Sequence, residues 1–388
     1  MFLELRLPSQ SLLHELPLGI QADETLYAAP VLYARHRHLN RLQTVFFLLL
    51  AAHRLKREAD PSLPAKAFFC TGNAGTGKSN VLKTYRDWLA GRDQMKTTGI
   101  ASAFGSAAAL IGGSTFASLI GMRIPNKSSE DELDIQDALT GKGTVLKVTD
   151  SLRDRLGGQL QCIIDEVSTL GHRAFNLHNQ TMNAVKDFGS GGHFGNVDTI
   201  YFGDLLQMKC VQDIPLYENP PKNCFNHWKS IENIVILNQV MRQQDDQLQF
   251  VALLNELRER QASEVVYRQL YERLVGSAQV PDLSTPLWLD ALFITTRHTL
   301  KRLINKEKAL SLSIRTGSPC YLYRATYRPV SSDSIVVDPN ILIKLGTLSP
   351  NDHGKMEGEI YITLGMPIVL VENGHTLQGL VNGAYGIL

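Results

Sequence analysis

The sequence has no long hydrophobic run, few cysteines and no excess of charge of either sign. Its most apolar stretch, Val45–Ala52, is far shorter than the ~20 residues that a membrane-spanning helix needs. The five cysteines are odd in number, widely spaced and never arranged as C-x-x-C. This usage is typical of reduced, mostly buried thiols in an intracellular protein. We therefore expect neither a membrane segment nor a structural zinc site.

The balance of charge leaves the class of partner open. The 39 Lys and Arg residues nearly cancel the 38 Asp and Glu residues, which gives a net charge of +1. A protein can still hold a nucleic acid strand in a local basic or aromatic groove, so this balance does not argue against one. The N-terminal region contains Glu4, Glu15, Asp23 and Glu24 and lacks an Arg-rich amphipathic stretch, so we expect no secretory or organellar presequence there.

Strand and helix patterns alternate along the 388 residues, which predicts an α/β fold with a parallel sheet. We expect strands at Ala67–Thr71, Thr97–Ala101, Leu160–Ile164, Asp198–Phe202, Ile234–Leu237 and Ala291–Thr295. We expect helices at Leu39–Arg57, Ser79–Leu89, Leu248–Arg258 and Thr299–Leu310. The predicted division is an N-terminal segment at 1–35, a first domain at 36–230, the start of a second at 231–316, and a β-rich tail at 317–388. The polar, acidic stretch 125–143 reads as a surface insertion.

A glycine-rich loop between the first strand and the next helix predicts a nucleotide site. It fits the pattern G-x-x-x-x-G-K-[ST] with Gly72, Asn73, Ala74, Gly75, Thr76, Gly77, Lys78 and Ser79. In such a loop the backbone N–H groups close around phosphate oxygens at a helix N-terminus, and the lysine reaches the β and γ phosphates. We therefore predict that the loop binds ATP and that Ser79 helps to hold Mg²⁺.

Two adjacent carboxylates follow the third predicted strand. The apolar run Leu160–Ile164 ends in Asp165 and Glu166, and ligands of parallel sheets bind at this carboxyl edge. We expect Asp165 to hold the magnesium ion and Glu166 to deprotonate the water that attacks the γ-phosphate. Two solvated loop acids are the alternative interpretation.

These motifs, with several others in order, resemble those of the petite-integration-frequency (PIF) family of superfamily-one DNA helicases, relatives of RecD. Ile163–Ser168 resembles the second motif of that family, Leu39–Gln43 its Q-motif, and Phe202–Gln207 its third motif. Ala107–Ala108 with Ile111–Phe116 resembles the motif that touches single-stranded DNA, Leu237–Gln243 the arginine motif, and Leu380–Gly383 with Gly386 a late segment of the second domain.

The resemblance implies a P-loop NTPase with a RecA-like first domain and a second, incomplete RecA-like domain. It also implies that Gln43 contacts adenine, that Gln207 senses the γ-phosphate and that Arg242 stabilises charge in the transition state. The residues alone, without the motif context, favour a solvated helix residue for Gln43, a loop amide for Gln207 and a surface ion-pair partner for Arg242.

The chain departs from the family pattern near the expected DNA contacts. Ala117 stands where the family usually has His, and Met208-Lys209-Cys210 follows Gln207 where it usually has Leu-Pro-Pro. The sequence ends at Leu388, before the Lys-Ser-Gln-Gly and Ser-Arg segments of the family. We therefore expect a shortened second motor domain.

The function that the resemblance implies is an ATP-dependent 5′–3′ DNA helicase that acts on single-stranded or forked DNA. Its cofactors would be ATP and Mg²⁺, and its setting DNA repair, recombination or telomere maintenance in the nucleus or, alternatively, the mitochondrion. The alternatives are a nucleotide-gated single-strand binder without unwinding activity, of host or mobile-element origin, and an ATPase that acts on protein.

Overall fold

The structure is a computed structural model whose chain divides into two compact units, with the boundary between Glu259 and Arg260. It describes residues 29–121, 149–188, 193–211, 213–222, 224–241, 248–275, 282–326, 340, 344–345, 357–371 and 383–388. The acidic stretch 125–143 therefore lies outside the described residues. Across the described helices, none has the length and apolar character needed to cross a bilayer.

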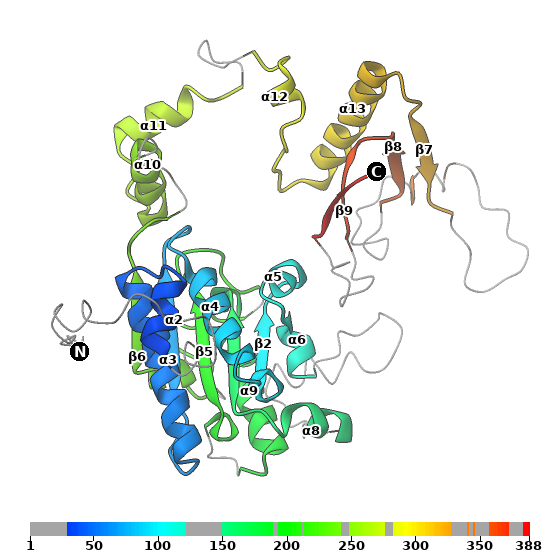
Figure 1. Cartoon of the computed structure of the whole chain (residues 1–388). Coiled ribbons are helices and arrows are strands. Elements are labelled where there is room, and N and C mark those ends of the chain that lie inside the picture. The colour runs from blue at the N-terminus through cyan, green and yellow to red at the C-terminus, as the bar shows by residue number, and fades with distance from the viewer. Residues whose placement is uncertain are drawn as a thin grey trace, which may run out of the picture. The chain divides into compact units, whose positions relative to one another are not determined.

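The first unit is built on a six-stranded parallel sheet (Figure 1). Its strands are β1 (Ala67–Gly72), β2 (Thr98–Ser102), β3 (Ser114–Thr115), β4 (Gln161–Asp165), β5 (Asp198–Gly203) and β6 (Asn233–Leu237). They lie in the order β3-β2-β4-β5-β1-β6, and every pair in this order is parallel. The strand that precedes the glycine-rich loop is therefore flanked by β5 and β6. The sheet confirms the α/β class that the alternating pattern predicts.

Helices cover both faces of this sheet. The helices described in the first unit are α2 (Pro30–His36), α3 (Arg41–Ala59), α4 (Lys78–Ala90), α5 (Gly105–Leu110), α6 (Phe116–Leu119), α8 (Asp150–Leu156), α9 (His172–Val185) and α10 (Leu248–Glu259), the last of which lies against the loops at the carboxyl edge. Successive side chains of a strand point to opposite faces, so Phe68 and Cys70 of β1 join one apolar cluster while Ala67 and Phe69 join the other. Because both faces are covered there, the central strands β1, β4 and β5 contain continuous apolar runs.

The first unit begins earlier in the sequence than the pattern predicts. Helix α2 crosses the expected boundary at residue 35, and its Tyr33 is buried and stacks on Phe47 of α3 at a ring-centroid distance of 5.9 Å. Helix α3 starts at a capping box, in which Asn40 and Gln43 exchange side-chain to backbone hydrogen bonds of 3.0 Å. The helix at 30–36 thus belongs to the core and not to a separate N-terminal segment.

The boundary between the units also differs from the expected one at residue 230. Strand β6 pairs in parallel with β1, with Phe68 opposite Asn233 and Gly72 opposite Leu237. It therefore completes the first sheet and does not begin a second. A single sequence shows that β6 is a strand, but it does not show which strand will be its neighbour.

The second unit contains helices and short antiparallel ladders in its described part. Its helices are α11 (Glu264–Tyr271), α12 (Pro286–Leu289) and α13 (His298–Thr316), and its strands are β7 (Tyr321–Arg324), β8 (Glu359–Ile362), β9 (Pro367–Val369) and β10 (Tyr385–Ile387). Strand β7 pairs with β8, and β9 pairs with β10. The predicted strand at Ala291–Thr295 is wrong. Ile294 is 98% exposed, and no described strand lies beside that segment to pair with it.

The core of the first unit contains two buried histidines without hydrogen-bond partners among the described residues. His178 of α9 packs against Phe194 and Phe116, at ring-centroid distances of 4.9 and 5.6 Å. His227 is likewise buried and unpaired. Burial, reinforced by neighbouring imidazoles, lowers the pKa of His178 to about 3 and that of His227 to about 4. Both side chains are therefore neutral in the folded protein near neutral pH.

We expect the folded protein to lose stability on acidification because of these two histidines. Their pKa values in the unfolded chain are about 6.5, so below that pH the unfolded state binds more protons and the free energy of unfolding falls as the pH drops towards about 4. Thermal melting between about pH 8 and about pH 5 measures this. The variant His178→Leu should show a shallower decline, and an identical slope for parent and variant would contradict the assignment.

Candidate nucleotide site

The phosphate loop runs from the end of β1 to the start of α4. A Cβ added to Gly72 would lie 2.3 Å from the Leu237 carbonyl oxygen, and one added to Gly77 would lie 2.3 Å from the Gln43 Nε2 atom. Both glycines also have positive φ values, 153° and 85°, which side chains other than glycine rarely adopt. The loop therefore brings its bare backbone to the N-terminus of α4, where N–H groups are free to bind an anion.

Lys78 lies folded over this loop. Its Nζ atom donates to the carbonyl oxygens of Gly72 and Asn73 at 2.7 and 3.1 Å. Burial lowers the pKa of the ammonium group, and the negative charges of Asp204 and Glu166 oppose this lowering. A partly desolvated cation held only by carbonyl groups is well placed to bind phosphate oxygens.

Asp165 and Glu166 lie at the carboxyl edge of the same sheet. Asp165 ends β4 and is 5% exposed, whereas Glu166 has a left-handed backbone (φ 55°) and donates its N–H to Asp165 Oδ1 at 3.0 Å. Burial, and then the charge of Glu166, raises the pKa of Asp165 to about 6. A nearby cation would offset both effects. A carboxylate and a hydroxyl are oxygen ligands of the kind that Mg²⁺ accepts, so Asp165 and Ser79 fit the expected ion.

The Gln43 side chain binds the backbone of the phosphate loop. This side chain is nearly fully buried, and Nε2 donates to the Thr76 carbonyl oxygen at 3.0 Å. Its Oε1 atom accepts the Asn40 N–H in the capping box of α3. The solvated alternative for this residue is therefore wrong. The adenine contact stays a prediction, and these two bonds leave one N–H of Nε2 and one acceptor site of Oε1 for it.

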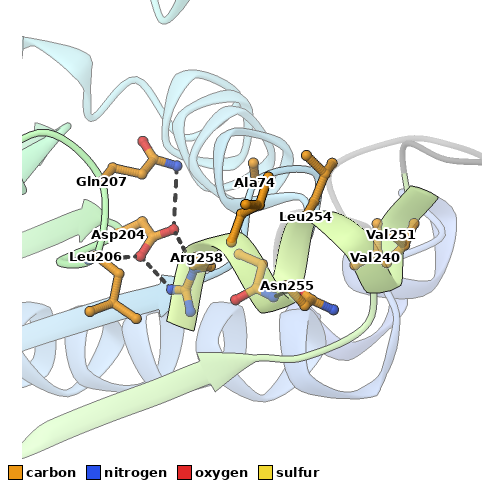
Figure 2. Close-up of a pocket in the computed structure, with 11 residues that line it drawn as sticks. Ala74, Asp204, Leu206, Gln207, Val240, Val251, Leu254, Asn255 and Arg258 are labelled. Carbon is orange, nitrogen blue, oxygen red and sulfur yellow. Dashed lines mark hydrogen bonds and ion pairs between the residues drawn. The ribbon is translucent and has the colours of Figure 1, made fainter. Parts of the chain in front are cut away.

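The loop that carries Gln207 is organised by a buried carboxylate, Asp204 (Figure 2). Gln207 itself is exposed, and its Nε2 atom donates to Asp204 Oδ2 at 3.3 Å. From α10, Arg258 forms an ion pair with Asp204 at 2.5 Å. These residues line a cavity of about 360 Å³ beside the phosphate loop. The rest of its wall comes from Asn73, Ala74, Leu206, Val240, Val251, Leu254, Asn255 and Leu257.

Sequence reasoning missed Asp204, Asn255 and Arg258 as site residues. Asn255 and Arg258 are three positions apart, so they share one face of α10, and they follow the apolar run 250–254 of that helix. Polar residues at the end of an amphipathic helix are common, so only the tertiary structure shows what these two side chains face.

The arginine motif approaches the phosphate loop, although Arg242 itself lies outside the described residues. Met241, the residue before it, donates its N–H to the Gly75 carbonyl oxygen at 2.8 Å. The chain therefore reaches the loop immediately before Arg242. The role of Arg242 stays a prediction, as do those of Gln243 and of 380–382.

The segment that resembles a DNA-binding motif lies at one end of the sheet. Strand β3 pairs with β2, with Ala101 opposite Ser114, and the flanking Phe104 and Leu110 are 48% and 70% exposed. An exposed aromatic ring such as that of Phe104 can stack on a base, and the contact with DNA stays a prediction.

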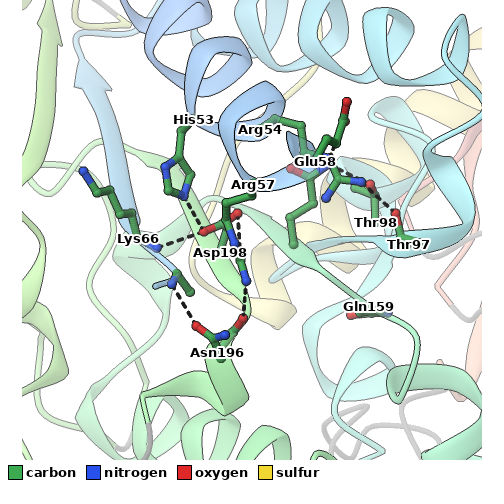
Figure 3. Close-up of polar contacts among 12 residues, drawn as sticks. His53, Arg54, Arg57, Glu58, Lys66, Thr97, Thr98, Gln159, Asn196 and Asp198 are labelled. Atoms are coloured by element: carbon green, nitrogen blue, oxygen red, sulfur yellow. Dashed lines mark hydrogen bonds and ion pairs between the residues drawn. The ribbon is translucent and has the colours of Figure 1, made fainter. Parts of the chain in front are cut away.

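A second buried polar cluster lies at the amino edge of the sheet (Figure 3). Asp198, the first residue of β5, accepts hydrogen bonds of 2.8 Å from His53 Nε2 and from the Lys66 N–H. Its other oxygen lies 3.0 Å from Arg57 Nη1, and Arg57 Nη2 donates to the Asn196 carbonyl oxygen. Because His53 and Arg57 of α3 both contact Asp198 of β5, this cluster fixes α3 to the sheet.

We expect Asp198→Ala to destabilise the protein by about 3–5 kcal/mol, because it leaves the Arg57 guanidinium buried without its counter-charge. The Arg57 side chain is only 9% exposed. Asp290→Ala is the matched control. It removes an ion pair of 2.8 Å between Asp290 and Arg315, in which the Asp290 side chain is 64% exposed. Exposed ion pairs of this kind contribute about 0–1 kcal/mol. Urea unfolding measures both, and equal midpoints for the two variants would contradict the prediction.

Residues 57–264 match a family model described as PIF1-like helicase. The chain is 31% identical over 188 residues to the uncharacterised protein 030L of Invertebrate iridescent virus 6. It is 28% identical over 335 residues to the ATP-dependent DNA helicase PIF1 of Homo sapiens. These alignments cover 46% and 84% of this chain but 33% and 44% of the two relatives, so the chain spans less than half of their length.

A solved structure of Bacteroides Pif1 bound to single-stranded DNA has the same fold, with a TM-score of 0.55 at 20% identity. The match covers 89% of this chain and 68% of that chain.

Proposed function

The chain belongs to the PIF1-like helicase family, and from this premise we propose that it hydrolyses ATP to move 5′ to 3′ along single-stranded DNA. One observation carries the proposal. Lys78, the Asp165–Glu166 pair and the Gln207 loop meet at the carboxyl edge of one parallel sheet, although 129 positions separate the first from the last. Ligands of such sheets bind at this edge. The relative bound to single-stranded DNA supports the choice of substrate.

Each of these residues has a chemical task in this proposal. The loop N–H groups and Lys78 bind the phosphates, and Asp165 with Ser79 would hold Mg²⁺, whose charge offsets that of the phosphoryl group. Glu166 accepts a proton from the attacking water, which suits a side chain only partly withdrawn from solvent. Gln207, held by Asp204, orients that water or reads the γ-phosphate.

The antiparallel ladders of the second unit favour a second candidate function. In its described part the strands form two two-stranded antiparallel sheets, unlike the parallel sheet of the first unit. The movement of a motor comes from two domains that close around the nucleotide, whereas a nucleotide-gated binder of single-stranded DNA that does not unwind can work with the nucleotide site of the first unit.

Strand displacement by the purified chain separates the two candidates. Duplexes with a single-stranded tail at either the 5′ or the 3′ end are mixed with protein and ATP, and release of the labelled strand is followed. The helicase proposal predicts release from the 5′-tailed substrate only, and none with Lys78→Ala. Release from the 3′-tailed substrate alone contradicts the polarity, and ATP-dependent binding without release supports the binder.

The family resemblance also motivates the cellular setting. We include in the proposal a role in DNA repair, recombination or telomere maintenance, in the nucleus or the mitochondrion. Localisation of the tagged chain in cells tests the compartment.

A further inference from the structure

The Asp204 carboxylate forms hydrogen bonds both to the loop that carries Gln207 and to Arg258 of α10. Its Oδ1 atom accepts the Leu206 N–H at 3.1 Å and Arg258 Nη2 at 2.5 Å. Its Oδ2 atom accepts Gln207 Nε2 and Arg258 Nε, each at 3.3 Å. Figure 2 shows the guanidinium group of Arg258 directed at this carboxylate. Because Asp204 is 1% exposed, its charge depends on Arg258 for compensation.

The same face of α10 also holds the phosphate loop. Asn255 Oδ1 accepts Asn73 Nδ2 at 2.8 Å, and the Asn73 carbonyl oxygen in turn accepts Lys78 Nζ. One helix therefore contacts both the loop that binds phosphates and the loop that carries Gln207. The two α10 residues that make these contacts, Asn255 and Arg258, lie outside the motifs that predict nucleotide binding.

The charge of Asp204 has a direct bearing on nucleotide binding. Asp204 and Arg258 line the cavity beside the phosphate loop, together with Asn73 and Ala74 of that loop. A triphosphate is a polyanion, so a carboxylate without its counter-charge at this position would repel it and would also compete for Lys78. The positive charge of Arg258 offsets the negative charge of Asp204 and so reduces both its repulsion of the triphosphate and its competition for Lys78.

We propose that Arg258 is a positioning residue of the nucleotide site: it neutralises Asp204 so that the cleft accepts a nucleoside triphosphate, and it fixes the loop that presents Gln207. The inference deepens the proposed function, on which it rests for the identity of the ligand. It assigns to Arg258 no contact with the phosphates themselves.

Equilibrium titration of the full chain with a fluorescent ribose-labelled ATP analogue tests the inference. Arg258→Ala should weaken binding by about tenfold, the effect of one charge at roughly 10 Å in a medium of effective dielectric constant about 20. Arg258→Lys, which keeps the charge, should retain most of the affinity. The double variant Arg258→Ala with Asp204→Asn should return to within about twofold of the parent, because no carboxylate is left to neutralise. Arg153→Ala, which removes an exposed ion pair with Asp187, is the matched control and should bind like the parent.

A purely structural role for the ion pair predicts a different pattern. In that case Asp204→Asn cannot rescue Arg258→Ala, since both variants lack the pair, and Asp204→Asn alone weakens binding. The proposal predicts that Asp204→Asn alone binds the analogue at least as tightly as the parent, and this test stands even if Arg258→Ala fails to fold. Weaker binding by Asp204→Asn, or unchanged binding by folded Arg258→Ala, overturns the inference.

The parent protein distinguishes failure of this inference from failure of the proposed function. A parent that binds the analogue without hydrolysing ATP overturns the proposed motor activity, but the comparison of the variants still tests the role of Arg258. A parent that binds no nucleotide overturns both.

Discussion

Replacing Glu166 by Gln should lower the rate of ATP hydrolysis by about 10²–10⁴-fold, the usual contribution of a positioned general base. The amide has nearly the same shape as the carboxylate but takes no proton from water. Glu166 follows the last residue of β4 directly and lies beside Asp165 at the edge where the phosphate loop ends. The variant should therefore fold and bind ATP like the parent while turning it over very slowly.

Steady-state phosphate release together with nucleotide titration measures this separation of binding from turnover. Glu218→Gln is a suitable control, because that half-exposed carboxylate forms only a long ion pair of 3.8 Å with Lys209 and lies outside the site. A Glu166→Gln variant with turnover close to that of the parent would show that another group takes the proton. A variant that loses ATP binding as well would point to a role in holding the ligand.

Replacing Lys78 by Ala should reduce turnover by about 10²–10³-fold, as the loss of one charged donor to a transferring phosphoryl group does. Unlike Glu166→Gln, this variant should also bind ATP more weakly, since the ammonium group contacts the phosphates in the ground state. The change removes the only side chain seen to bridge the carbonyl groups of Gly72 and Asn73 in the described loop.

Nucleotide titration of Lys78→Ala beside Lys66→Ala checks this expectation. Lys66 is an exposed lysine just before β1, at the other end of the strand from the loop, and its replacement should leave affinity unchanged. Equal affinities for the parent and Lys78→Ala would contradict the proposed phosphate contact.

The parts of the site that depend on short stretches of sequence were predictable. The phosphate loop is fixed by glycines at 72 and 77 whose backbone no other residue fits, and this requirement is visible in the sequence itself. The same holds for the strand that ends at Asp165, because an apolar run followed by two acids marks the edge of a buried strand. Local patterns of this kind survive in the fold because packing and propensity agree.

The parts that depend on partners far away in the sequence were not predictable. Asp204 and Arg258 are 54 residues apart, and Asn73 and Asn255 are 182 residues apart. Nothing local distinguishes Arg258 from any other arginine near the end of a helix. Strand β6 was assigned to the wrong domain for the same reason, because its parallel neighbour β1 lies more than 160 residues earlier in the sequence. Gln43 was expected near adenine, and its bond to Thr76 across 33 residues could likewise not be foreseen.

The measurement that bears most directly on the central claim is ATP turnover by the purified chain, with and without single-stranded DNA, with Glu166→Gln as the reference for background. A DNA-coupled motor predicts turnover that rises strongly when single-stranded DNA is added and that falls to background in the variant. Turnover that is the same with and without DNA, or no turnover despite tight ATP binding, would contradict the proposal that this chain converts ATP hydrolysis into movement on a strand.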